Sequence, residues 1–134
     1  MKIYTSYFAK QKELEKLGIT CIGICAIPPK WFTGPNMASV APTKDILFEQ
    51  KAHRDNERYT RRYREEVLCI LKEPQLFIDT LKFCSDGKDV ALLCYEKPDD
   101  FCHRHILADF LNEKLDLGIT EYEFNKEPTS VSLF

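Results

Sequence analysis

Reactive side chains concentrate in one short segment of this sequence, between the end of an apolar run and the start of a helical pattern. A connection with only a structural role requires turn-forming residues such as Gly, Asn, Asp or Pro, and it does not require thiols, an imidazole and a guanidinium. We therefore expect the chemistry of this protein to lie here. The segment contains six candidate side chains: Cys94, Glu96, Lys97, Cys102, His103 and Arg104.

Cys102 is expected in the first turn of a helix. Free backbone N–H groups and the helix dipole favour negative charge there, and His103 and Arg104 act in the same direction. A thiol of lowered pKa would serve as a nucleophile or redox group, with His103 as acid–base and Arg104 binding an anionic group of the substrate. We expect Cys102 to be the most reactive cysteine. Alternatively, the helix N-terminus binds a phosphate or carboxylate and the thiols only pack.

Cys94 is the second candidate thiol because it ends an apolar strand beside a polar loop. The neighbouring Glu96 is expected either to oppose ionisation of Cys94 or to act as its acid–base partner. Glu96 would not oppose the ionisation of Cys94 if Lys97 or Arg104 screens the carboxylate charge. The structural alternative is that Glu96 and Lys97 pair with each other and Cys102 packs under the loop.

No metal site is predicted, and the sequence leaves the cofactor unknown. Cys94, Cys102, His103 and His105 could supply ligands, but neighbouring helical residues point about 100° apart and the sequence has no Cys-x2-Cys knuckle. Transient metal binding stays open. A Walker loop and a GxGxxG motif are both absent from the sequence, and Asp100 stands where a Cys-x5-Arg phosphatase loop starting at Cys94 needs arginine.

Length and composition indicate one small globular domain. The chain has 134 residues, 44% of them hydrophobic and 30% charged, and its net charge of −2 does not favour nucleic-acid binding by overall electrostatics. Residues 1–6 lack the apolar core of a signal peptide, and no apolar run approaches membrane-spanning length. We expect a cytoplasmic protein without membrane association. The six cysteines are then expected to be free thiols, with Cys21, Cys25, Cys69 and Cys84 buried as small hydrophobes.

Strand-like and helix-like patterns alternate along the chain, which predicts an α/β fold: a single three-layer domain with a mainly parallel, Rossmann-like sheet. The domain is expected over residues 1–124, followed by a loosely ordered tail at 125–134. A cap at Asp99 or Asp100 is expected to begin the last helix, and Gly118 to end it. Strands are expected at residues 2–5, 20–26, 89–95 and 119–124, and helices at residues 8–17, from 44 onward, at 55–71 and at 74–85.

Loops that follow parallel strands meet at one edge of the sheet, where ligands of such folds bind. This topology places Thr5 and Ser6, the loop of Trp31, and the segment at 94–104 around one rim. Thr5, Ser6 and Trp31 are therefore candidate substrate-binding residues. Trp31 is expected either to cover hydrophobic core or to act as a lid over the site.

The helix expected at 55–71 is rich in arginine and tyrosine. Such a composition can bind a nucleic-acid backbone or a phosphorylated ligand. Glutamates share the same helix, so a solvated, salt-paired face is the favoured interpretation. Tyr59 is retained as a candidate substrate-binding residue.

The segment at 94–104 resembles the signature of the DUF488 family, a bacterial and archaeal group named for its lack of known function. The family pattern is an apolar strand ending in L-L-C-x-E-K, a short loop, and C-H-R at the start of a helix. The W-F-x-G stretch at residues 31–34 resembles one subgroup. The resemblance implies a compact α/β domain with an active site of unassigned activity. Many members carry Asp-x-Arg near the end of the second strand, where this chain has Cys25-Ala26-Ile27, and arginines of the 55–71 helix are one conceivable replacement.

Three classes of function stay open. The first is a small enzyme with a Cys/His/Arg/Glu site acting on an anionic substrate that contains phosphate or a nucleotide. The second is a non-catalytic module that binds a nucleotide or nucleic acid, and the third is a structural or partner-binding protein. The sequence assigns neither the substrate nor the oligomeric state.

Overall fold

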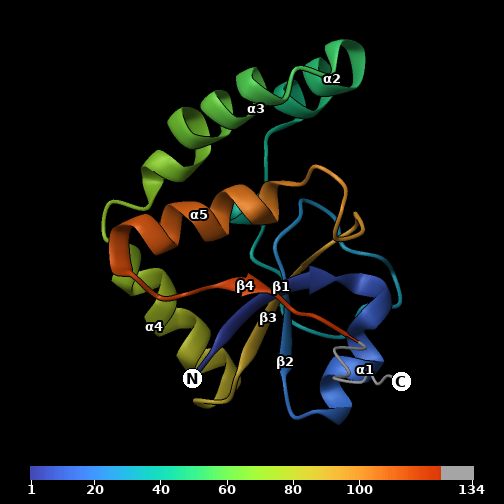
Figure 1. Ribbon diagram of the computed structural model, residues 1–134, viewed down its shortest axis with the longest axis vertical. Coiled ribbons are helices and arrows are strands. Elements are labelled where there is room, and N and C mark those ends of the chain that lie inside the picture. The colour runs from blue at the N-terminus through green and yellow to red at the C-terminus, as the bar shows by residue number, and fades with distance from the viewer. Residues whose placement is uncertain (125–134) are drawn as a thin grey trace, which may run out of the picture.

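The computed structural model describes residues 1–124 as a sheet of four parallel strands with helices on both faces (Figure 1). The predicted α/β class and the parallel sheet are therefore confirmed. The tail predicted at 125–134 lies outside the described residues. No helix within residues 1–124 is long and apolar enough to span a membrane.

The strands occur in the spatial order β2-β3-β1-β4. β3 is one of the two inner strands, and all five of its residues are buried, as its continuous apolar run predicts. β1 pairs with β3 so that Tyr7 lies opposite Cys94, which brings the carboxyl ends of the two strands together. The strands are β1 (Ile3–Tyr7), β2 (Thr20–Gly23), β3 (Val90–Cys94) and β4 (Thr120–Glu121).

β2 is shorter than the predicted strand at 20–26, and a later segment of the chain lies along its outer edge. The Gly23 backbone N–H donates to Pro35 O, and its carbonyl accepts from Met37 N. A Cβ at Gly23 would collide with Asn36 Oδ1, so this close approach requires glycine. The loop that follows β2 therefore folds back along the sheet edge.

The helices cover the sheet unevenly. In Figure 1, α5 lies between the sheet and the α2–α3 pair. The helix predicted at 55–71 consists of α3, a π-helical turn and a 3₁₀ turn, joined end to end. The helical segments are η1 (Phe8–Lys10), α1 (Gln11–Lys16), η2 (Ala38–Val40), α2 (Lys44–His53), α3 (Asn56–Arg62), η3 (Tyr63–Val67), η4 (Leu68–Ile70), α4 (Pro74–Ser85) and α5 (His103–Leu115).

Both predicted ends of the last helix are wrong. Cys102, in an extended conformation, is the N-cap of α5, so neither Asp99 nor Asp100 caps it. At the other end Asp116 adopts the left-handed conformation (φ 52°) and terminates the helix before Gly118. The whole connection at 95–101 thus stays outside the helix and is exposed.

Two hydrophobic clusters form the core, one on each face of the sheet. The larger packs α3, α4 and α5 against β3 residues such as Val90 and Leu92, and the smaller packs Phe8 and Leu14 against Leu93. Cys94 and Cys102 belong to the larger cluster. Cys21 and Cys25 are buried as predicted, but Cys69 and Cys84 are exposed, so burial is wrong for the latter two. Each of them lies on the outer side of its helical segment.

Candidate functional site

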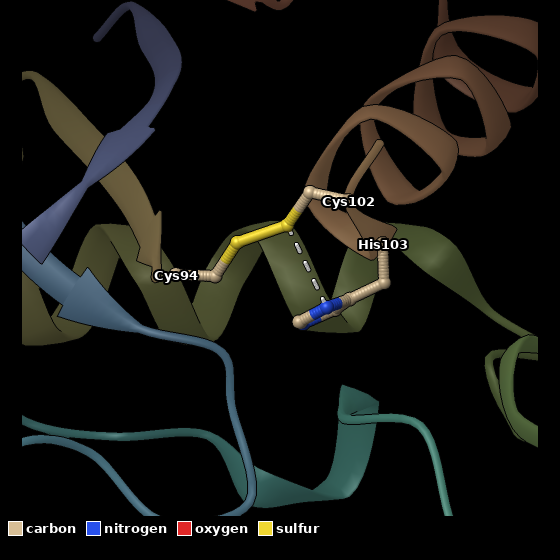
Figure 2. A group of neighbouring side chains, drawn as sticks. All are labelled: Cys94, Cys102 and His103. Atoms are coloured by element: carbon tan, nitrogen blue, oxygen red, sulfur yellow. Dashed lines mark hydrogen bonds between the residues drawn. A yellow bond between two sulfur atoms is a disulfide. The ribbon is translucent and has the colours of Figure 1, made fainter. Parts of the chain in front are cut away.

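Cys94 and Cys102 meet where β3 ends and α5 begins, and the structure joins them through a disulfide (Figure 2). The expectation of six free thiols is therefore wrong for this pair. Both residues are almost completely buried, and their Cα atoms lie 7.7 Å apart. The fold brings the two sulfurs together because the strand end and the helix start face each other across the 95–101 loop.

His103 points at the same place as Cys102 (Figure 2). The two side chains converge because Cys102 has extended backbone angles (φ −154°, ψ 146°), so the 100° rotation of a continuous helix does not separate them. His103 Nδ1 lies 3.8 Å from Cys102 Sγ, and Nε2 lies 2.6 Å from Ile24 O. A carbonyl only accepts hydrogen bonds, so Nε2 carries the proton and Nδ1 presents its lone pair to the sulfur.

The imidazole of His103 is neutral. Burial lowers its pKa to about 4, and the positive charge of Arg104 acts in the same direction. The ring also packs edge-on against Tyr63, with centroids 5.6 Å apart. A buried, neutral and oriented histidine can accept a proton or donate its lone pair to a ligand.

Arg104 is completely buried, and its guanidinium contacts protein groups on several sides. Nη1 donates to Cys94 Sγ at 3.0 Å and to Glu96 O at 2.7 Å. Nε and Nη2 donate to the two carboxylate oxygens of Glu121 at 3.0 and 3.1 Å. Arg104 thus places its positive charge against the Cys94 sulfur, whereas its predicted contact with a substrate anion stays untested.

Glu121 was not predicted from the sequence as a site residue. It pairs with Thr5 across β4 and β1, and Thr5 Oγ1 donates to Glu121 Oε1 at 2.6 Å. Glu121 shares one face of its strand with the buried Ile119. A carboxylate on the buried face of a predicted strand requires a partner, and this signal was available in the sequence.

The Glu96 carboxylate also contacts Cys94, with Oε1 3.6 Å from Cys94 Sγ, while the Glu96 carbonyl accepts from Arg104 Nη1. The Glu96 carboxylate is therefore close enough to disfavour a Cys94 thiolate, as predicted, and the positive charge of Arg104 is close enough to screen it. Lys97 is exposed and forms no ion pair within residues 1–124, so the suggested pairing of Glu96 with Lys97 is absent there.

Aromatic side chains of α3 and η3 pack beside the two cysteines, in the larger core cluster. Tyr59 is buried and contacts Phe101 of the 95–101 loop, with ring centroids 4.9 Å apart. Burial raises the pKa of the Tyr59 hydroxyl, and the charge of Glu96 raises it further. The Tyr63 hydroxyl donates to Val40 O. Tyr59 therefore lies at the site, against the loop that covers the two cysteines.

Trp31 and Ser6 lie on the other face of the sheet. The exposed Trp31 ring contacts Phe8 at 6.5 Å between centroids, and Phe8 also contacts Tyr95 at 5.1 Å. Trp31 thus lies near the carboxyl ends of β1 and β3 but borders the smaller core cluster. Ser6 is completely buried, and its Oγ has no hydrogen-bond partner among the described residues.

The arginines of the α3 segment form surface ion pairs. Arg58 bonds to Glu49, Arg62 to Glu66, and Arg64 to Glu113, each at 2.7 Å. The salt-paired face favoured by the sequence is therefore present. Their carboxylate partners hold these three arginines at the surface, and the suggested replacement of Asp-x-Arg by arginines of this helix stays a prediction.

The fold and the site agree with the result of sequence comparison. A family model described as "Active DUF488-N3 subclade" matches residues 8–115 of this chain. The chain belongs to the DUF488 family. The matched segment contains both cysteines, His103 and Arg104. Searches of curated proteins and of solved structures found no match.

Proposed function

We propose that this chain is a small enzyme whose reaction runs through Cys94 and Cys102 as a redox-active thiol pair. The observation that carries the proposal is the contact of 3.0 Å between Arg104 Nη1 and Cys94 Sγ, next to the sulfur of Cys102. A guanidinium in this position stabilises a thiolate when the disulfide is reduced. The description of the matching family model as an active subclade is consistent with an enzyme.

The residues have separate roles in this proposal. The Cys94 thiolate attacks one sulfur of a substrate disulfide and displaces the other half as a thiolate. Cys102 then attacks Cys94 Sγ, which releases the second half and forms the Cys94–Cys102 disulfide. His103 Nδ1, 3.8 Å from Cys102 Sγ, accepts the proton of Cys102. The substrate disulfide gains two electrons and leaves as two thiolates, and the two cysteines lose the same two electrons. His103 passes the one proton of Cys102 to a departing thiolate or to solvent.

Access to the two sulfurs requires movement of the 95–101 loop, since both cysteines are buried beneath it. The loop is exposed along its length, and its few described contacts include the packing of Phe101 on Tyr59 and the bond from the Tyr95 hydroxyl to Ile27 O at 2.6 Å. Opening the loop breaks these side-chain contacts and the bond from Arg104 to Glu96 O, but none of the strand pairing, so it costs less than opening the sheet beneath it.

A substrate that carries an anionic group, such as a phosphate or a nucleotide, is part of the proposal. Lys97 is the observation that favours it, because this exposed lysine lies in the covering loop without an ion pair in residues 1–124. A non-catalytic module that binds the same ligands is the second candidate. It predicts binding that survives the loss of both thiols.

The test uses 5,5′-dithiobis(2-nitrobenzoate), a disulfide that carries two carboxylates. The reduced protein with Cys69→Ser and Cys84→Ser should release two thionitrobenzoate ions rapidly and end with the Cys94–Cys102 disulfide. Adding Cys102→Ser should stop the reaction at a mixed disulfide on Cys94, after one release. Adding Cys94→Ser instead should remove the rapid phase. Stable mixed disulfides on both cysteines, or no rapid phase in the parent, would overturn the proposal.

A further inference from the structure

We infer that the reduced protein binds one thiophilic divalent cation of the Zn²⁺ class through Cys94 Sγ, Cys102 Sγ and His103 Nδ1. The inference goes beyond the proposed function, because it requires the thiols to be reduced but requires no turnover. All three residues are buried, and their ligand atoms lie within 4.8 Å of one another. Figure 2 shows the three side chains pointing toward a common place.

The spacing of the ligand atoms suits a tetrahedral site. Bond lengths of about 2.3 Å to sulfur and about 2.0 Å to nitrogen place neighbouring sulfur and nitrogen ligands roughly 3.5 Å apart. Cys102 Sγ and His103 Nδ1 are 3.8 Å apart. This pair therefore needs only a small adjustment to share an ion.

The histidine is already oriented as a ligand. Its Nε2 donates to Ile24 O at 2.6 Å, which fixes the ring and directs the unprotonated Nδ1 toward the sulfurs. Metal-bound histidines in proteins have this support, in which the second ring nitrogen donates to a carbonyl or carboxylate. Packing against Tyr63 restricts the ring further. The main entropic cost of arranging this ligand is thus met by the fold.

The backbone leaves room for an ion between the sulfurs. The Cα atoms of Cys94 and Cys102 are 7.7 Å apart, whereas disulfides usually span about 4.4–6.8 Å. Two reduced sulfurs can therefore separate around a cation while the strand end and the helix start stay in place. The fourth position falls to Glu96, whose Oε1 lies 3.6 Å from Cys94 Sγ, or to water.

The charges also balance. Two thiolates and one divalent cation are neutral together, which limits the cost of burying them. The guanidinium of Arg104 donates to Cys94 Sγ and is itself neutralised by Glu121. The disulfide form has no thiolate to offer, so the same two cysteines bind the cation only when they are reduced. Bound cation would in turn mask both thiols from substrate.

The experiment titrates Co²⁺, as a visible probe, and then Zn²⁺ into the reduced protein carrying Cys69→Ser and Cys84→Ser, with a phosphine reductant. One equivalent of Co²⁺ should give the intense ligand-field bands of a tetrahedral site and a thiolate-to-cobalt charge-transfer band. Zn²⁺ should displace it at one equivalent. The oxidised protein should show neither band.

His103→Ala should weaken Zn²⁺ binding at least tenfold, whereas the matched variant His53→Ala, at an exposed histidine, should leave it unchanged. If His103→Ala does not fold, Cys102→Ser provides the same comparison through loss of the charge-transfer intensity of one thiolate. Absence of a tetrahedral spectrum, or unchanged affinity in these variants, would overturn the inference. Thionitrobenzoate release from the metal-free protein tests the redox proposal separately, so each can fail alone.

Discussion

Arg104 and Glu121 form a two-point ion pair, at 3.0 and 3.1 Å, in which the guanidinium is completely buried. The pair links the first turn of α5 to the edge strand β4. Its geometry leaves Arg104 Nη1 directed at Cys94. The electrostatic environment of the thiol therefore depends on a carboxylate that does not contact it.

Replacing Glu121 by Gln should destabilise the fold by about 3 kcal/mol, because the buried Arg104 charge loses its partner. Urea unfolding measures the change. Glu113→Gln is the matched control, since Glu113 pairs with Arg64 at the exposed surface and its loss should change stability little. Equal effects of the two variants would contradict a structural role for the buried pair.

Cys94 should be more reactive than Cys102 in the reduced protein, which reverses the order expected from the sequence. The contact with Arg104 favours the Cys94 thiolate, whereas Cys102 faces the neutral His103. Limiting iodoacetamide labelling between pH 6 and 9, read by mass spectrometry, gives the order. Arg104→Lys should slow the labelling of Cys94 at pH 7 by about tenfold for each unit by which its pKa rises. Lys97→Ala serves as the control, and faster labelling of Cys102 would restore the sequence-based order.

Cys21 and Cys25 should resist alkylation at pH 8 while Cys69 and Cys84 react. Burial raises the pKa of Cys21 to about 12 and that of Cys25 to about 11, with smaller contributions from Glu15 and Glu96 respectively. Both thiols are therefore protonated across the ordinary pH range. Mass-spectrometric counting of modified residues in the folded protein tests this. Rapid labelling of Cys21 would show that the smaller core cluster opens.

The metal-free, oxidised protein should lose stability on acidification because of His103. Its pKa is about 4 in the folded chain and about 6.5 when unfolded, so only the unfolded chain binds this proton between those values. The contribution is fully present above pH 6.5 and decreases as pH falls toward 4, by on the order of 3 kcal/mol in total. Urea unfolding midpoints at pH 7 and pH 5 measure the part of this loss that falls between those two pH values.

His103→Gln should flatten this dependence, since an amide can donate to Ile24 O and does not titrate. The exposed His53 offers the comparison: His53→Gln should leave the pH dependence as it is. The prediction fails if the His103 variant retains the full loss of stability between pH 7 and pH 5.

The sheet was predictable because its strands have recognisable local sequence patterns. Helix-length patterns lie on either side of the apolar run that forms β3. Strands separated in this way by helices pair in parallel through crossover connections. The two cysteines were placed at the ends of β3 and of the connecting loop for the same reason. Strand ends were less predictable, as β2 shows, because its outer edge is paired with the loop at residues 35–37, a contact that no local pattern indicates.

The helix start was mispredicted because capping preference is a weak local signal. Aspartate is favoured at an N-cap, yet Asp99 and Asp100 remain in the exposed loop and Cys102 takes the position. Burying Cys102 in the larger core cluster outweighs the capping bond that an aspartate would form. This one shift is what allows Cys102 and His103 to converge.

The sequence alone determined the class of fold and the segment that contains the reactive side chains. The first follows from the periodicity of hydrophobic residues, and the second from residue types that lie close together in the chain. Only the tertiary structure decided the partners of those groups. The contacts of Arg104 with Glu121 and of His103 with Ile24 join residues far apart in the chain. Long-range contacts of this kind follow from how the strands and helices pack, and no local pattern specifies them.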